Sequence, residues 1–339
     1  MKPDPVPALA GCHRLCLTPT RNERWIIAPF LAAARRWATR VIIADQGSTD
    51  GTREFLESAH GVEVLRNPSV HYDEAGRQRL LLGAARRVEG PRFLLGLDAD
   101  EALSANSAGS ADWARIAAAA PGTVVRLRWV NLLPGLREAW IPPGHTAFGF
   151  IDDGSPHEGR AIHSPRVPYP AGAPVLDLDE IVVLHFQYTA WERMRSKQRW
   201  YQAWELLNGG RPLETYRRYH HMHGGWPREE IVPVDPAWLA GFADLGADFD
   251  RLQPESIPWW DRELVALLAR HGPGRFRRLA IWDRDWNAVA RELGDKSPAL
   301  DDPRGAFERS VHRLLALTQS RRDGWTARGL ERALRLAGW

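Results

Sequence analysis

The sequence has little cysteine and no long hydrophobic run. Only Cys12 and Cys16 occur among 339 residues, which is too few to brace a chain of this size with disulfide bonds, and no Cys and His spacing is typical of a zinc site. No uninterrupted apolar stretch is long enough to span a bilayer, and the N-terminal residues lack the apolar core of a signal peptide. We therefore expect a reduced, cytoplasmic protein without a transmembrane segment.

A large excess of either charge is also missing. The formal net charge is +3, from 45 basic and 42 acidic residues, and the two signs are interspersed along the chain. This excess is too small to indicate nucleic-acid binding, although a mildly basic chain suits a phosphate-bearing ligand. Hydrophobic residues make up 44% of the chain, enough for a sizeable core. Most of the 16 Trp residues are expected in that core, with one or two beside a sugar-binding groove.

The first hundred residues alternate short apolar runs with helical patterns. The predicted strands are 13–18, 41–44, 62–65 and 93–97, and the predicted helices are 23–37, 52–59 and 73–88. Continuous apolar strands that alternate with helices indicate an α/β fold, in which a mostly parallel sheet is flanked by helices. Such sheets bind ligands beyond the carboxyl ends of their strands.

The pattern loosens after residue 104. A helix is expected over 111–120, and strands over 124–130 and 181–188; residues 131–180 are rich in Pro, Gly, His and Asp and are expected to be irregular. From residue 189 onward the chain is mainly helical by its periodicity. We expect an α/β domain over 1–210 and a helical C-terminal extension over 211–339.

Two carboxylates, Asp98 and Asp100, follow the fourth predicted strand. Side chains alternate along a strand, so the two project to the same side at its carboxyl edge. Like charges held there repel each other unless a cation or a donor relieves them, and oxygen ligands favour Mg²⁺ or Mn²⁺. The pattern predicts a divalent metal site, with a solvated acidic turn as the alternative.

Polar residues also follow the first two predicted strands. Asp45 ends the second strand, ahead of a turn and a helix start. A carboxylate there can accept a hydrogen bond from a pyrimidine imide or a ribose hydroxyl, but an ordinary strand–turn–helix connection has the same composition. Thr20 and Glu23 follow the first strand and fit a capping box for the first helix, in which Pro29 predicts a kink.

These three segments have the order and spacing of the motifs of family 2 glycosyltransferases. Residues 19–23 read Pro-Thr-Arg-Asn-Glu, 45–52 read Asp-Gln-Gly-Ser-Thr-Asp-Gly-Thr, and 97–101 read Leu-Asp-Ala-Asp-Glu. The sequence resembles that family well over 13–104 and more loosely over 105–205. The resemblance implies a GT-A fold, a Rossmann-like sheet that holds a UDP- or GDP-sugar together with Mn²⁺ or Mg²⁺.

The resemblance also implies roles for single residues. The nucleotide-sugar-binding residues are expected to be Thr18, Thr20, Glu23, Asp45, Arg77 and Asp98. The metal ligands are expected to be Asp98, Asp100 and His185. Arg77 falls where the family usually carries an Arg-Asn pair, but Gln78 replaces that Asn, so a solvent-facing helix position is an equal alternative. His185 lies in an apolar strand, where a buried core histidine is the alternative.

A general base must deprotonate the acceptor hydroxyl in an inverting transfer. The pair His157 and Glu158 resembles a His-Glu pair that several bacterial family members carry near the acceptor, so Glu158 is the expected base and Asp153 the second choice. Loop caps and turn formers are the alternative for both residues.

The sequence thus predicts a metal-dependent, inverting glycosyltransferase that acts on a glycan or lipid-linked acceptor, as in cell-envelope or exopolysaccharide synthesis. Peripheral contact with a membrane is compatible with the basic and aromatic C-terminal region. A sugar-phosphate nucleotidyltransferase is an alternative, although residues 19–23 lack the Gly-rich basic loop it needs. The other alternative is a non-catalytic nucleotide-sugar-binding protein on the same scaffold.

Overall fold

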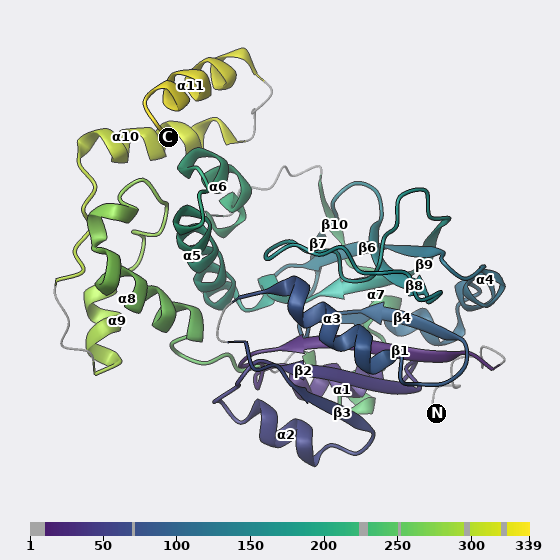
Figure 1. Ribbon diagram of the computed structural model, residues 1–339. Coiled ribbons are helices and arrows are strands. Elements are labelled where there is room, and N and C mark those ends of the chain that lie inside the picture. Colours follow the sequence, from purple (N-terminus) through teal and green to yellow (C-terminus); the bar gives the residue numbers. More distant parts are fainter. Residues whose placement is uncertain (1–10, 70–71, 224–229, 250–251, 295–298, 320–323) are drawn as a thin grey trace. The chain divides into compact units, whose positions relative to one another are not determined.

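The computed structural model describes residues 11–69, 72–223, 230–249, 252–294, 299–319 and 324–339 (Figure 1). The chain divides into two compact units. The first comprises Met1–Thr189 and Val232–Pro254, and the second Ala190–Ile231 and Glu255–Trp339. The first part of the α/β unit thus ends before residue 210, where we expected the division, because the next long helix packs with the C-terminal helices. The unit also includes the later segment Val232–Pro254. In the part of the chain that the structure describes, no helix is both long and apolar enough to cross a bilayer.

The first unit is built on one mixed sheet. Its described strands are β1 (His13–Thr20), β2 (Arg40–Asp45), β3 (Val62–Arg66), β4 (Arg92–Gly96), β5 (Glu101–Leu103), β6 (Val124–Leu132), β7 (Glu138–Trp140), β8 (Thr146–Ile151), β9 (Val175–His185) and β10 (Ile231–Pro233). They follow the order β10-β7-β6-β8-β4-β1-β2-β3, and β9 pairs with β5 and β6. The block β3-β2-β1-β4 is parallel, whereas β8 runs antiparallel to both β4 and β6.

Helices cover the parallel block on both faces. The helices of this unit are α1 (Ile27–Ala34), α2 (Thr52–Ser58), α3 (Glu74–Ala85), α4 (Asp112–Ala118) and α7 (Pro236–Leu239). Helix α3 packs across β1 and β2 (Figure 1), and right-handed crossovers place α1 and α2 on the opposite face. Leu15, Ile42, Leu81 and Leu94 form the buried core under α3. The predicted class, an α/β sheet flanked by helices, is confirmed.

The strand register aligns the carboxyl ends of three strands. Thr20 pairs with Asp45, and Leu17 pairs with Gly96. Asp98 therefore follows β4 close to the level at which β1 and β2 end. The three polar segments singled out in the sequence lie along one edge of the sheet, as expected.

The predicted start of the first helix was wrong. Thr20 belongs to β1, and its hydroxyl donates to Asp45 (3.3 Å). Helix α1 begins at Ile27 without a side-chain cap, so no capping box forms at this position. Pro29 lies in the first turn of α1, where backbone N–H groups have no partner inside the helix, and it forces no kink.

The segment expected to be irregular contains β7, β8 and most of β9. Strand β7 pairs with its neighbour β6, whereas β8 and β9 also pair with β4 and β5, which lie far away in sequence and are not revealed by a local pattern. Gly149 of β8, for example, lies against Phe93: a Cβ at position 149 would be 2.7 Å from the Phe93 ring.

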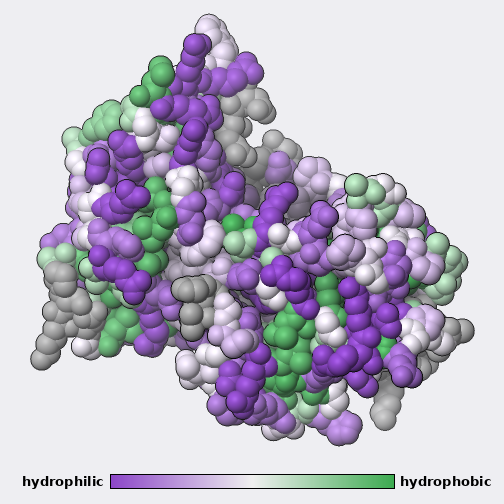
Figure 2. Space-filling view, in the orientation of Figure 1, coloured by the Kyte–Doolittle hydropathy of each residue, from purple (hydrophilic) through white to green (hydrophobic). Residues whose placement is uncertain are grey.

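The second unit is helical, as the sequence predicted for the C-terminal region. Its helices are α5 (Trp191–Leu207), α6 (Pro212–Arg218), α8 (Trp259–His271), α9 (Trp286–Glu292), α10 (Ala306–Leu317) and α11 (Trp325–Leu336). Leu264, Phe276 and Trp286 are among the buried residues of its core. Hydrophobic side chains also reach the surface of α10 and α11, where green atoms stand among purple ones (Figure 2).

Candidate active site

Asp45 lies fully buried at the end of β2. Its carboxylate accepts hydrogen bonds from the Thr20 hydroxyl (3.3 Å), the Ser48 backbone (3.2 Å) and two guanidinium nitrogens of Arg53 (2.9 and 2.7 Å). The hydrogen bond and charge of Asp45 raise the pKa of Arg53. The Asp45 carboxylate is thus hydrogen-bonded within the protein. A direct hydrogen bond from a nucleotide base would have to replace one of these donors. Sequence reasoning missed Arg53, which stands one residue inside α2.

The loops after β1 and β2 are tied together beside Asp45. Asn22 has a positive φ of 57°; its backbone donates to Ser48 Oγ (2.9 Å), and its side-chain oxygen accepts from the Thr49 backbone (2.8 Å). The Glu23 carboxylate accepts from the Trp25 indole (2.8 Å). Asn22 and Glu23 therefore shape this edge from within the protein.

Thr18 lies one pleat deeper than Thr20 and is completely buried. Its hydroxyl is 3.6 Å from the Cys16 sulfur, and burial raises the pKa of that thiol to about 12. Thr18 therefore lies inside the sheet, beneath the edge that carries Thr20.

Three acidic residues and one arginine meet just beyond β4. Arg166 donates from Nη2 to Asp98 Oδ2 (3.1 Å) and to Glu101 Oε1 (2.9 Å), and its Nη1 contacts the second Glu101 oxygen. Glu101 also accepts from the Asp98 backbone (2.8 Å). Asp100 and Glu101 are buried, whereas the Asp98 side chain is 31% exposed. The two aspartates of the pair expected from the sequence therefore differ in exposure.

Burial dominates the electrostatics of this cluster. Burial raises the pKa of Glu101 and outweighs the neighbouring charge of Arg166, which lowers it. Burial alone would lower the pKa of Arg166, but the charges of Asp98 and Glu101 raise it by more. The pKa of Arg166 therefore lies above its usual value, and the guanidinium stays protonated. These four side chains are three carboxylates and one guanidinium, and most of them are shielded from water.

Arg166 was not expected from the sequence. It comes from the irregular segment between β8 and β9 and lies against Gly96, where a Cβ would be 2.9 Å from the Arg166 Cβ. Its guanidinium carbon lies 5.0 Å from the centroid of the Phe148 ring and 5.8 Å from that of Trp129. The one local signal was Gly96 in an otherwise apolar strand, which marks a close backbone approach without saying what approaches.

Asp100 and His185 face each other across the β5–β9 pair. His185 Nε2 lies 3.6 Å from Asp100 Oδ2, and His185 Nδ1 lies 2.7 Å from Asn131 Oδ1. The His185 ring also stacks on Trp129, with centroids 4.8 Å apart. The two ring nitrogens of His185 thus face Asn131 and Asp100.

This arrangement fits a divalent cation. An imidazole nitrogen held by a hydrogen bond on its other side is a common metal ligand, and Mg²⁺ is often bound by one or two carboxylates plus substrate phosphates. Among the described residues no group of three or more His, Cys, Asp or Glu side chains has the geometry of a metal site. Asp100 and His185 offer one carboxylate oxygen and one imidazole nitrogen, 3.6 Å apart, to which a cation would bind.

The two expected base candidates lie in different places. The Asp152 backbone donates to the Arg92 carbonyl at the start of β4 (2.9 Å), so Asp153 stands at the amino edge, roughly 20 Å along the strand from Asp98. The chain then returns toward α3, where the Ala75 backbone donates to the Arg160 carbonyl (3.1 Å). The structure therefore separates Asp153 from the carboxyl-edge cluster and places it in a turn.

Glu158 lies on the returning segment and is exposed. The preceding His157 lies 2.7 Å from the Pro165 carbonyl through Nε2, and a Cβ at Gly159 would be 2.6 Å from Ala75 Cβ. Helix α3 begins at the carboxyl edge of the sheet. Because this segment contacts the start of α3, it carries Glu158 toward the same edge as Asp98.

Arg77 is held at the start of α3. Its guanidinium lies 3.6 Å from Glu74 and 5.4 Å from the centroid of the Tyr72 ring, and 16% of its side chain is exposed. Glu74 is buried and also accepts from the Tyr72 hydroxyl (2.7 Å) and the Ser164 backbone (2.8 Å). Arg77 is therefore mostly buried, and its contacts with Glu74 and Tyr72 place it beside the returning segment.

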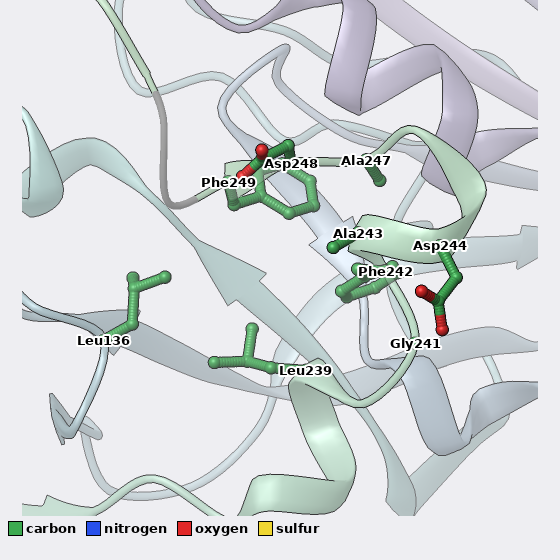
Figure 3. A pocket seen from close by; sticks show the side chains of 9 residues that line it. All are labelled: Leu136, Leu239, Gly241, Phe242, Ala243, Asp244, Ala247, Asp248 and Phe249. Atoms are coloured by element: carbon green, nitrogen blue, oxygen red, sulfur yellow. The ribbon is translucent and has the colours of Figure 1, made fainter.

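A small pocket of about 130 Å³ lies on another side of β9. It is lined by Leu136, Leu239, Gly241, Phe242, Ala243, Asp244, Ala247, Asp248 and Phe249 (Figure 3). The Phe249 ring stacks on Phe186 (3.9 Å between centroids), whereas the preceding His185 faces Trp129. Neighbouring residues of an extended chain point to opposite sides, so the pocket is separate from the Asp100–His185 pair.

Comparison with known proteins agrees with the three motifs. Residues 16–108 match the model of glycosyl transferase family 2, which confirms the predicted resemblance over this part. The matched residues include Thr20, Asp45, Asp98 and Asp100. No curated protein matches the chain.

Solved structures give only remote likenesses. A mycobacterial protein is 16% identical over 36% of this chain and 42% of its own, with a TM-score of 0.28. A mannose-1-phosphate geranyltransferase from Thermus thermophilus is 19% identical over 41% and 50%, at 0.27. GalNAc-T7 with UDP, GalNAc and Mn²⁺ is 12% identical over 78% and 58%, at 0.31. Each alignment covers less than two thirds of the neighbour's length, and likenesses this weak carry no argument about function.

Proposed function

We propose that the protein is an inverting glycosyltransferase of the GT-A fold, which moves a sugar from a UDP- or GDP-sugar to a hydroxyl group of a glycan or lipid-linked acceptor in cell-envelope or exopolysaccharide synthesis. The observation that carries the proposal is the meeting of three family 2 motifs at one carboxyl edge, with Asp100 and His185 face to face. Open α/β sheets bind nucleotides at this edge.

In this proposal Asp100 and His185 hold Mn²⁺ or Mg²⁺, and Asp98 lies at the ribose side. The bound cation would neutralise charge on the leaving diphosphate. The protein orients the metal ligands, since Asn131 and Trp129 hold the His185 ring from two sides. Thr20 and Asp45, with Arg53, shape the nucleoside end.

Glu158 is the proposed general base. It is exposed on the segment that α3 supports, and it is free to approach an acceptor hydroxyl without giving up a buried ion pair. Asp153 is not proposed, because it lies at the other edge of the sheet and its carboxylate accepts from the Ser155 backbone (2.9 Å). The hydrogen bonds from Ser155 lower the pKa of Asp153 and weaken it as a base.

A lipid-linked acceptor is supported by the surface of α10 and α11. Their exposed large apolar residues are Phe307, Leu314, Leu317, Trp325 and Leu336. Their exposed arginines are Arg309, Arg313, Arg328, Arg332 and Arg335, and within the described residues of these two helices no Asp or Glu is exposed. Apolar and basic side chains together suit peripheral contact with an anionic membrane. Co-sedimentation with anionic but not zwitterionic vesicles tests this contact.

A screen of donor hydrolysis across nucleotide sugars, with Mn²⁺ and with Mg²⁺, tests the proposed activity. Release of a nucleoside diphosphate from one UDP- or GDP-sugar is expected. A nucleotidyltransferase would instead release pyrophosphate from a nucleoside triphosphate and a sugar phosphate. A non-catalytic binding protein would bind a donor without consuming it, and either outcome would replace the proposal.

A further inference from the structure

Arg166 joins only one of the two aspartates that the sequence pairs. It binds Asp98 Oδ2 and both oxygens of Glu101, whereas Asp100 lies against His185. The two aspartates therefore have different partners although they are two residues apart. Arg166 hydrogen-bonds to one aspartate of the pair, and an imidazole nitrogen lies beside the other.

We propose that Arg166 is a positioning residue that divides the aspartate pair between two ligands. It holds Asp98 for the nucleoside side and leaves Asp100 and His185 to bind the divalent cation. This inference rests on the cation site of the proposed function. A guanidinium matches the two oxygens of a carboxylate, and a divalent cation at those oxygens would be repelled by the fixed positive charge beside it.

The surroundings of Arg166 keep it in this position. Gly96 leaves room for its backbone, and the Phe148 and Trp129 rings lie beside its guanidinium. Glu101 is fully buried and binds it through both oxygens. Arg166 therefore cannot swing into solvent to free Asp98 without leaving Glu101 as a buried charge with a lost partner.

A double-mutant cycle on Mn²⁺ affinity tests the division. The affinity is measured on the full chain by electron paramagnetic resonance of free Mn²⁺, with UDP or GDP present. Asp98→Asn is made in the natural chain and in an Arg166→Met, Glu101→Gln background. This background removes one positive and one negative charge, so the net charge of the cluster is unchanged.

In the natural chain, Asp98→Asn is expected to change the Mn²⁺ dissociation constant by less than about threefold, because Asp98 is not a ligand. In the background variant Asp98 is released, and the same change is expected to weaken binding by about tenfold or more, the range for groups that tune a metal site. Equal effects of Asp98→Asn in the two backgrounds overturn the division. If the background variant does not fold by circular dichroism, Arg166→Lys replaces it, since a single amine cannot hold both carboxylates.

The outcomes separate this inference from the proposed function. Binding of Mn²⁺ by the natural chain together with equal effects of Asp98→Asn rejects the role of Arg166 and leaves the cation site standing. Binding by the background variant but not by the natural chain rejects both, because the division leaves Asp100 and His185 to bind the cation in the natural chain. Absence of binding in both chains rejects both.

Discussion

The two ends of β4 carry buried carboxylates with opposite electrostatics. At the amino end, Asp152 accepts hydrogen bonds from Arg86 (2.9 Å) and Arg92 (2.9 Å). Burial raises the pKa of Asp152, but these two arginines lower it more, so its pKa lies below the usual value. At the carboxyl end, burial raises the pKa of Glu101, and the single arginine there, Arg166, does not reverse the shift.

The difference separates a structural charge cluster from a functional one. Asp152 has two arginines for one carboxylate, and in the helical unit Asp283 likewise binds both Arg195 and Arg199. Each of these two carboxylates is therefore paired with two arginines of the protein itself. At the carboxyl end of β4, Arg166 hydrogen-bonds to the carboxylates of Asp98 and Glu101, and burial raises the pKa of Glu101. Acids with perturbed pKa values are typical of binding sites.

The largest effect is expected at the carboxyl end. Asp100→Asn keeps one neutral oxygen but loses the charge that attracts a cation, and it should abolish transfer even at saturating Mn²⁺. Chelation of the natural protein should have the same effect, since a metal at the diphosphate supplies several kcal/mol of transition-state stabilisation. Radiolabelled sugar transfer measures both. Full activity in excess chelator would sink the metal-dependent mechanism.

The second effect concerns Glu158. Glu158→Gln keeps the shape of the side chain but cannot accept a proton, and general-base removal typically lowers rates by about 10²–10⁴. We expect this loss in kcat with nearly unchanged donor affinity by calorimetry. Asp153→Asn is the matched control, because Asp153 lies at the amino edge and should leave kcat within about twofold. A loss in Asp153→Asn without one in Glu158→Gln would reverse the assignment.

The third effect is expected at the amino end and on stability alone. Asp152→Asn leaves two arginines beside a neutral amide, and losing one member of a buried ion pair typically costs about 3 kcal/mol of unfolding free energy. Urea unfolding measures the loss. Transfer per folded molecule should remain, the reverse of the result for Asp100→Asn, which should keep its stability. If both variants lose the same property, the comparison between the two ends fails.

The parallel part of the fold and its edge could be predicted because their signals are local. Each of β1, β2 and β4 is a short apolar run followed by a polar residue, and parallel strands bring such residues to one edge whatever the details of the loops. The strand register confirmed this for Thr20, Asp45 and Asp98. The helical character of the C-terminal part was also readable from periodicity.

The partners of those residues could not be predicted, because they depend on how the chain folds back. Arg166 reaches Asp98 from 68 positions away, through a segment without a regular pattern. Asp153 is near Glu158 in sequence, but β8 runs antiparallel to β4, so Asp153 follows it at the amino edge of the sheet. Asp45 was expected to stay open to a base, and only the position of α2 reveals that Arg53 occupies it.

The smallest effect is a pH dependence that follows from the opposite shifts at the two ends of β4. The pKa of Asp152 is lower in the folded protein than its ordinary value of 3.8. Its ion pairs therefore stabilise the fold above about pH 4, and this contribution is lost as the pH falls through the folded pKa. The stability gap between the natural protein and Asp152→Asn should therefore be widest near neutral pH.

That gap should narrow as the pH falls from about 5 to about 3. The pKa shift of Glu101 has the opposite sign, since its pKa is raised above the ordinary value of 4.5. Its contribution to the free energy of unfolding is therefore present below that pH and is lost as the pH rises. Glu101→Gln should therefore lose stability relative to the natural protein at acidic pH and recover part of it toward neutral pH. Urea unfolding of both variants across this range decides the matter, because gaps that run in the same direction with pH would mean that the two ends do not differ in charge balance.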